Sequence, residues 1–189
     1  GGKVFMTPKD IPRPGLRIAA ACKDMDLDDQ DIVVVVQGDE PLINPGMIEL
    51  AVKPLLKYPD IFCVNLAADM SEEEWKDPNE IKVVTDLNMN AIFMSRSPIP
   101  SNTRNRIGQR MKQVCVMPFT KKNLLAFQKM APTPLEIAES IEMLRAIEHG
   151  FKVRMVKTGF ISKSVDNEGD RKGVEKLMKE DVIYKKHAF

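Results

Sequence analysis

The sequence predicts an α/β fold, and three observations carry this prediction. Segment 32–36 has five consecutive β-branched residues without polar alternation, which indicates a strand buried on both faces, as in a parallel sheet. Helical segments precede and follow it, and strands alternating with helices are typical of layered α/β proteins. Hydrophobic residues make up 43% and charged residues 29% of the 189 residues, which suits one sizeable globular core.

The first third of the chain supplies several strands and helices around this run. Residues 4–7, Val-Phe-Met-Thr, are expected to form a strand near the amino-terminal end. A helix is expected over about 16–25, and an apolar helix begins at the pair Pro45-Gly46 and reaches about residue 57. Segment 61–66 is a second candidate for a buried strand. These elements predict a sheet with helices packed on it.

The middle of the chain has the pattern of a β-hairpin. Segments 82–86 and 91–95 have strand composition, and the short polar loop 87–90 separates them. The arginine-bearing stretch up to residue 110 is expected to be a loop. We interpret the hairpin, about 81–96, as an insertion in a single domain that spans 1–189, because the sequence contains no repeat, low-complexity tract or linker.

The last third returns to alternating strands and helices. Two strands are expected, and three helices, the second of which ends before Gly150. The expected strands are 113–119 and 153–156, and the expected helices are 121–130, 135–148 and 166–178.

Charge and cysteine content exclude several classes of partner. The 28 basic and 27 acidic residues leave a formal charge of +1, which gives no electrostatic reason to expect nucleic acid or an anionic membrane as a partner. No apolar run approaches the roughly 20 residues that a membrane-spanning helix needs. The three cysteines are odd in number and far apart, which favours reduced thiols in a cytoplasmic protein over a disulfide framework.

A candidate metal ligand follows the β-branched run. Ligands of open α/β sheets bind beyond the carboxyl ends of the strands, and there the chain reads Gln37-Gly38-Asp39-Glu40. Gly38 permits close approach of the backbone to a ligand, and Mg²⁺ prefers a few carboxylates together with water and phosphates. Asp39 is therefore a candidate magnesium ligand, and a capping or turn residue is the alternative.

A second acidic group precedes the last expected helix. Asp166 stands in the segment Val-Asp-Asn-Glu-Gly-Asp, and its simplest role is to cap that helix, which stabilises a helix by about 1 kcal/mol. A functional role for Asp166 requires that the fold place it beside Asp39.

Several segments in the same order resemble the 3-deoxy-manno-octulosonate cytidylyltransferase (CMP-KDO synthetase) family. The signature segment is VVQGDEPLI at 35–43. The other matching segments are residues 1–7, 81–86, 93–100, 134–145 and 165–166. The resemblance implies a three-layer, Rossmann-like nucleotide-diphospho-sugar transferase fold with a mixed sheet.

The family transfers CMP from CTP to the anomeric hydroxyl of the sugar acid KDO, for lipopolysaccharide or surface-polysaccharide biosynthesis, and releases pyrophosphate. By resemblance, the catalytic residues Asp39 and Asp166 hold Mg²⁺. Gln37, Arg96 and Glu139 match positions near the sugar, and Arg17 matches an arginine in the nucleotide-side loop. The hairpin resembles the family's dimerising element, so the resemblance also implies a homodimer.

The sequence departs from the family in two ways. The family's first strand and phosphate-binding loop are not matched, so we expect an amino-terminally truncated fold with an uncovered strand edge. Polar substrate residues are also replaced, at positions that include Leu16, Gln113, Met117 and Met143. Three readings stay open: an enzyme completed by a missing segment, a relative that acts on another sugar acid or nucleotide, or a non-catalytic, dimer-forming binding or scaffolding protein.

Overall fold

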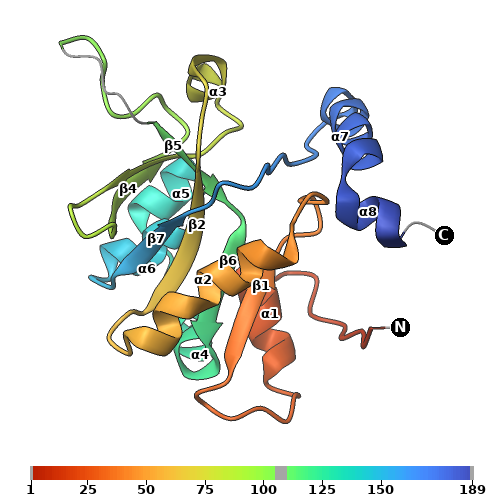
Figure 1. The fold of residues 1–189 in the computed structure, drawn as a ribbon. Coiled ribbons are helices and arrows are strands. Elements are labelled where there is room, and N and C mark those ends of the chain that lie inside the picture. The colour runs from red at the N-terminus through yellow and green to blue at the C-terminus, as the bar shows by residue number, and fades with distance from the viewer. Residues whose placement is uncertain (1, 105–109, 188–189) are drawn as a thin grey trace.

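The computed structural model describes residues 2–104 and 110–187, and Figure 1 shows the arrangement of their elements. Within these ranges no helix is long and apolar enough to cross a membrane. The helices are α1 (Pro14–Cys22), α2 (Pro45–Lys57), α3 (Glu72–Lys76), α4 (Lys121–Lys129), α5 (Pro134–Glu139), α6 (Met143–Glu148), α7 (Glu168–Glu180) and α8 (Val182–His187). The strands are β1 (Ile32–Val36), β2 (Cys63–Asp69), β3 (Lys82–Thr85), β4 (Ala91–Ser95), β5 (Met111–Val114), β6 (Val116–Thr120) and β7 (Val153–Lys157).

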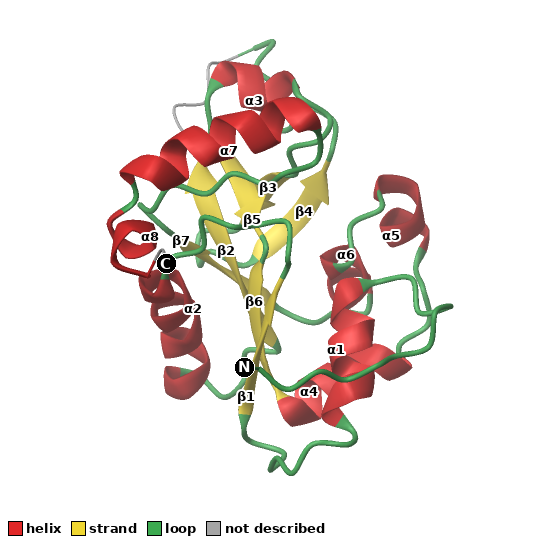
Figure 2. Ribbon diagram, turned by 90° about the vertical axis from the view of Figure 1, so that its right-hand side faces the viewer, coloured by secondary structure: helices red, strands yellow, loops and turns green. Residues whose placement is uncertain are grey.

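The seven strands form one mixed sheet with helices on both faces, which confirms the predicted α/β class (Figure 2). The strand order is β1-β6-β2-β5-β3-β4, and β7 pairs with β2. The β2–β7 pair is parallel, whereas the other pairs are antiparallel. The hairpin β3–β4 extends the same sheet through β5, so it is continuous with the core.

Two apolar clusters hold the layers together, one on each face of the sheet. Helix α2 contributes Met47, Ala51 and Leu55 to one cluster. Helices α1, α4 and α6 contribute to the other, which includes Ala19 and Leu124. Helix α2 begins at its predicted residue because Asn44 caps it, accepting a hydrogen bond from the N–H of Gly46 at 2.8 Å.

The β-branched run forms β1, but its surroundings differ from the prediction. It pairs antiparallel with β6 at the end of the strand order, and only Val35 is buried. Apolar clusters do contact both of its faces, through Val33 on one side and Val34 on the other. The run is therefore apolar because helices cover both faces, and the parallel pairing that we expected is wrong. The most buried strand is β2.

Three element boundaries also differ from the sequence prediction. Residues 4–7 form no strand. The expected strand 113–119 is divided at Cys115 into β5, which pairs with β2 and β3, and β6, which pairs with β1 and β2. The expected helix 135–148 is divided into α5 and α6 because Ser140 adopts a left-handed conformation, with φ of 56°. The division at Cys115 places that residue on the wall of the cavity described below.

A buried carboxyl lies where α6 meets α1. Glu142 is 9% exposed, and its Oε2 accepts a hydrogen bond from the N–H of Gly15 at 3.2 Å. No described group donates to its Oε1. Burial raises the pKa of this carboxyl above its ordinary range, although Arg145 and Arg13 act in the opposite direction.

Glu142 should therefore make stability depend on pH. The folded chain keeps the carboxyl protonated to a higher pH than the unfolded chain, in which the carboxyl has a pKa of about 4.3. The free energy of unfolding therefore falls as the pH rises from the pKa of the unfolded state through the raised pKa of the folded state. Glu142→Gln should remove this pH dependence. At pH 7, its free energy of unfolding should be at least equal to that of the native chain. Urea denaturation between pH 4 and 8 measures it, with the exposed Glu49→Gln as the control. An unchanged pH slope would contradict the assignment.

Candidate active site

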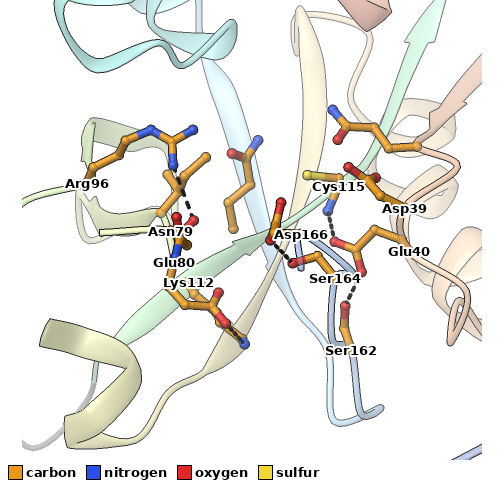
Figure 3. Close-up of a pocket in the computed structure, with 13 residues that line it drawn as sticks. Asp39, Glu40, Asn79, Glu80, Arg96, Lys112, Cys115, Ser162, Ser164 and Asp166 are labelled. Carbon is orange, nitrogen blue, oxygen red and sulfur yellow. Dashed lines mark hydrogen bonds and ion pairs between the residues drawn. The ribbon is translucent and has the colours of Figure 1, made fainter. Parts of the chain in front are cut away.

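A polar cavity of about 190 Å³ opens at the end of β1, between the loop after β1, strand β5 and the segment before α7 (Figure 3). The loop that carries Asp39 forms one wall of the cavity, and segment 162–166 forms a second wall. The opposite wall comes from residues 79–81 and from Arg96, at the end of β4. The lining residues are Gln37, Asp39, Glu40, Asn79, Glu80, Ile81, Arg96, Lys112, Gln113, Cys115, Ser162, Ser164 and Asp166.

The structure brings the two predicted metal ligands to the same cavity. The backbone N–H of Val165 donates to the carbonyl oxygen of Asp39 at 2.9 Å, which joins the two loops directly. Asn167, not Asp166, caps α7, so the capping role considered for Asp166 is wrong. Asp166 instead faces the cavity, and its Oδ2 accepts a hydrogen bond from Ser164 Oγ at 2.9 Å (Figure 3).

The donor set at this place fits magnesium. Both Asp39 and Asp166 are exposed carboxylates. Among the described residues, no three histidine, cysteine or acidic side chains are gathered so as to hold a metal by themselves. Mg²⁺ is commonly held by one or two carboxylates, with water and substrate phosphates completing its shell, so two convergent aspartates suffice.

A buried acid supports the loop that carries Asp39. Glu40 accepts hydrogen bonds from Ser162 Oγ at 2.7 Å and from the N–H of Cys115 at 3.5 Å, which links three walls of the cavity. Burial raises the pKa of Glu40, and burial likewise raises the pKa of the Cys115 thiol. Buried thiols with a raised pKa are typically structural and unreactive.

Arg96 lies across the cavity from the aspartates, while Glu139 lies behind it. Arg96, for which the resemblance implies a place near the sugar, lines the cavity. Glu139 is outside the lining set, and its two oxygens accept hydrogen bonds from Ser95 Oγ at 2.7 Å and the N–H of Arg96 at 2.9 Å. Glu139 also accepts a hydrogen bond from Arg96 Nε at its carbonyl oxygen, at 3.0 Å, so it contacts both the backbone and the side chain of Arg96 without lining the cavity.

Gln37 and Asp39 separate this cavity from a second hollow on the α1 side of the loop. Arg17 and Ile18 line that hollow with residues 36–39. The guanidinium of Arg17 donates to Thr7 Oγ1 at 3.1 Å and to the carbonyls of residues 8 and 9. The structure thus places Arg17 on a different side from Arg96, with the Asp39 loop between them.

Sequence reasoning missed the basic residue that supports the floor of the cavity. In the sequence, Arg104, Arg106, Arg110 and Lys112 form a basic cluster with polar neighbours, a pattern that favours a solvated loop face. Lys112 is instead buried, and its Nζ donates to Glu74 Oε1 at 2.6 Å and Glu80 Oε1 at 2.8 Å. Arg106 lies outside the described residues. The sequence signal was the position of Lys112 within a strand, where a lysine needs a partner once it is buried.

The replaced position Gln113 is also part of the wall. Its Nε2 donates to Asn65 Oδ1 at 2.5 Å, and Asn65 in turn donates to the carbonyl of Val114 at 2.8 Å. These bonds fix the orientation of the Gln113 amide beside the cavity. Met117 and Met143 are buried in the apolar core, so neither offers a hydrogen-bond donor to the site.

Comparison with known proteins agrees with this geometry. A family model described as cytidylyltransferase matches residues 1–157. The 3-deoxy-manno-octulosonate cytidylyltransferase of Geobacter metallireducens is 41% identical over 191 residues, which cover 94% of this chain and 74% of that protein. The enzyme of the same name from Solibacter usitatus is 36% identical over 185 residues, which cover 97% and 72%.

A solved structure shows the same fold. The structure of CMP:2-keto-3-deoxy-manno-octonic acid synthetase complexed with CTP matches with a TM-score of 0.85 and 27% identity, over 95% of this chain and 73% of that chain. This match confirms the predicted nucleotidyltransferase-like fold. The chain therefore belongs to the cytidylyltransferase family, and within it to the enzymes named 3-deoxy-manno-octulosonate cytidylyltransferase.

Proposed function

We propose that the chain is a magnesium-dependent nucleotidyltransferase that transfers CMP from CTP to a 3-deoxy sugar acid, KDO or a close relative, and releases pyrophosphate. The reaction serves lipopolysaccharide or surface-polysaccharide biosynthesis. The observation that carries the proposal is the convergence of Asp39 and Asp166 on one cavity, with Arg96 on the opposite wall. A relative with 27% identity was solved as a complex with CTP, which supports the nucleotide.

Each of the two spaces binds one substrate: the sugar acid lies in the cavity, and the nucleotide lies in the neighbouring hollow. Arg96 is the cation of the sugar side, and it supplies guanidinium N–H groups to the carboxylate of the sugar acid. Gln37 lines both spaces, so its amide lies where the nucleotide and the sugar meet. Arg17 borders the nucleotide side. The residues thereby hold two reactants in one orientation, which is the main contribution of a protein to displacement at phosphorus.

Asp39 and Asp166 are the residues that would hold Mg²⁺. The metal would neutralise phosphate charge and orient the reacting oxygens. Lys112, paired with Glu74 and Glu80, holds the floor of the cavity, and Glu40 holds the Asp39 loop against Ser162. We place the reaction in the cytoplasm, a location supported by the three free cysteines.

The test of the function is release of pyrophosphate from CTP in the presence of magnesium and KDO. The chain and a version extended at its amino terminus with the first strand and phosphate-binding loop of a family member should be assayed together. Release that depends on both CTP and the sugar acid is the expected result. A folded chain that releases none in either form, with KDO or with other 3-deoxy sugar acids, would instead favour the non-catalytic binding or scaffolding role.

The hairpin β3–β4 is the proposed dimer contact. Leu87 at its tip and Ile92 on β4 are exposed apolar side chains, and β4 ends the strand order of the sheet. Leu87→Asp together with Ile92→Asp should therefore convert a homodimer to a monomer, because charge replaces the apolar contact. Light scattering after size exclusion measures the change, with Leu56→Asp on α2 as the exposed control. A native chain that is monomeric would contradict the proposal.

A further inference from the structure

A fully buried lysine lies behind the wall of the cavity that residues 79–81 and Arg96 form. Lys82, the first residue of β3, is 0% exposed and is not among the residues that line the cavity. Its Nζ donates to three backbone carbonyl oxygens, those of Asp77, of Glu80 at 2.9 Å and of Arg96 at 2.8 Å. A lysine ammonium has three donors, so these bonds use its full capacity.

Arg96 contacts the same loop with its side chain. Its Nη1 donates to the carbonyls of Pro78 at 3.1 Å and Asn79 at 3.3 Å. All four consecutive carbonyls of 77–80 thus accept hydrogen bonds from two cations, Lys82 and Arg96. The carbonyl of Arg96 is in turn bound to Lys82, so the ammonium joins the loop to Arg96, the residue proposed to bind the sugar acid.

Among the described residues, the N–H of Glu80 also donates to the carbonyl of Asp77 at 3.2 Å, while the carbonyls of 78–80 are bound by the two cations. Pro78 has no N–H, and the N–H of Asn79 bonds only locally, to Asp77 Oδ1 at 2.8 Å. Residues 77–79 are exposed, so carbonyls that lose the ammonium can bind water instead, and the loop should then move from its present position. That movement would displace Asn79 and Glu80, both of which line the cavity.

We propose that Lys82 is a positioning residue for recognition of the sugar acid, acting through Arg96 and the 77–80 loop without touching the substrate. The inference rests on the proposed function only for the identity of the substrate. The Asp39 loop and the hollow lined by Arg17 have no hydrogen bond to Lys82 among the described residues. The effect of Lys82 should therefore be confined to one of the two substrates.

The first test is the steady-state kinetics of Lys82→Met. The KM for the sugar acid should rise at least about tenfold, since misplacement of a positioning group by about 1 Å can cost a hundredfold. The KM for CTP should stay within about twofold. Lys53→Met, which changes an exposed lysine on α2, is the matched control and should change neither value. Equal increases in both KM values, or no increase in either, would overturn the proposal.

Two further variants separate positioning from a loss of folding. Lys82→Gln keeps two N–H donors without the charge, so its KM for the sugar acid should fall between those of the native chain and Lys82→Met. In an Arg96→Ala background, Lys82→Met should raise that KM much less than it does in the native chain, because the residue it positions is already gone. Full additivity of the two changes would overturn action through Arg96.

Hydrogen exchange distinguishes failure of this proposal from failure of the proposed function. Lys82→Met should speed amide exchange at Arg96, whose N–H donates to Glu139, and leave exchange in the β1–β6 pair unchanged. Faster exchange throughout the sheet, or unchanged exchange at Arg96, would show that Lys82 does not organise this wall. If no sugar acid is turned over by the native chain, the proposed function fails, while the exchange result still decides the role of Lys82.

Discussion

Asp39→Asn should lower nucleotidyl transfer at least about a hundredfold and leave the fold intact. The side chain is exposed at the cavity and accepts no hydrogen bond from a described residue, so removal of its charge breaks no packing. The carbonyl oxygen of Asp39, which binds the N–H of Val165, is unchanged by the substitution. Asparagine is similar in size but offers a neutral oxygen, a much weaker ligand for a hard cation.

Pyrophosphate release at several magnesium concentrations measures the effect. Asp39→Asn and Asp166→Asn should both need more magnesium, and the double variant should be little worse than either single one, because both act on one ion. Asp26→Asn removes an exposed aspartate away from the cavity and is the matched control. Normal turnover by Asp39→Asn at low magnesium would show that this carboxylate is not a metal ligand.

Local patterns predicted those elements whose signals lie within the element itself. Helix α2 matches its prediction from Pro45 to Lys57, because Asn44, Pro45 and the apolar spacing all mark it locally. The hairpin was likewise found from its two strands and polar loop. The divisions at Cys115 and Ser140 were missed because each depends on distant partners, namely the strands that β5 and β6 join and the α1 end that α5 contacts.

The candidate site was predicted only in part: the two aspartates were found from the sequence, and the lysines that support the site were not. The glycine-flanked Asp39 and the Asp166 segment stood out in the sequence, and the fold brings them to one cavity. The supporting lysines did not stand out, since Lys82 and Lys112 are charged residues in short strands whose partners are loop carbonyls and acids on other elements. Only the folded chain shows that these charges are buried and compensated.

The second large effect should come from Arg145→Met, which should lower the free energy of unfolding by about 3–5 kcal/mol. Arg145 and Glu136 are 3% and 2% exposed, and the guanidinium donates to both carboxylate oxygens at 2.7 Å. Removal of the guanidinium leaves Glu136 as a buried charge whose remaining basic neighbour, Arg13, lies at 3.6 Å. Urea denaturation at pH 7 measures the loss.

Two comparisons test whether the uncompensated charge is the cause. Arg171→Met also removes an arginine that pairs with two glutamates, but this one is exposed on α7, so the loss should be far smaller. Combining Arg145→Met with Glu136→Gln removes both charges and should restore part of the stability lost in the single variant. A double variant less stable than Arg145→Met would contradict this explanation.

Arg145→Met should also affect substrate binding at the cavity. Glu136 and Glu139 lie on α5, and the pair with Arg145 holds that helix against α6 across the left-handed turn at Ser140. Glu139 in turn fixes Ser95 and the N–H of Arg96. Arg145→Met, under conditions where it remains folded, should therefore raise the KM for the sugar acid more than the KM for CTP. A loss of stability with both KM values unchanged would show that the α5–α6 junction supports the fold without orienting Arg96.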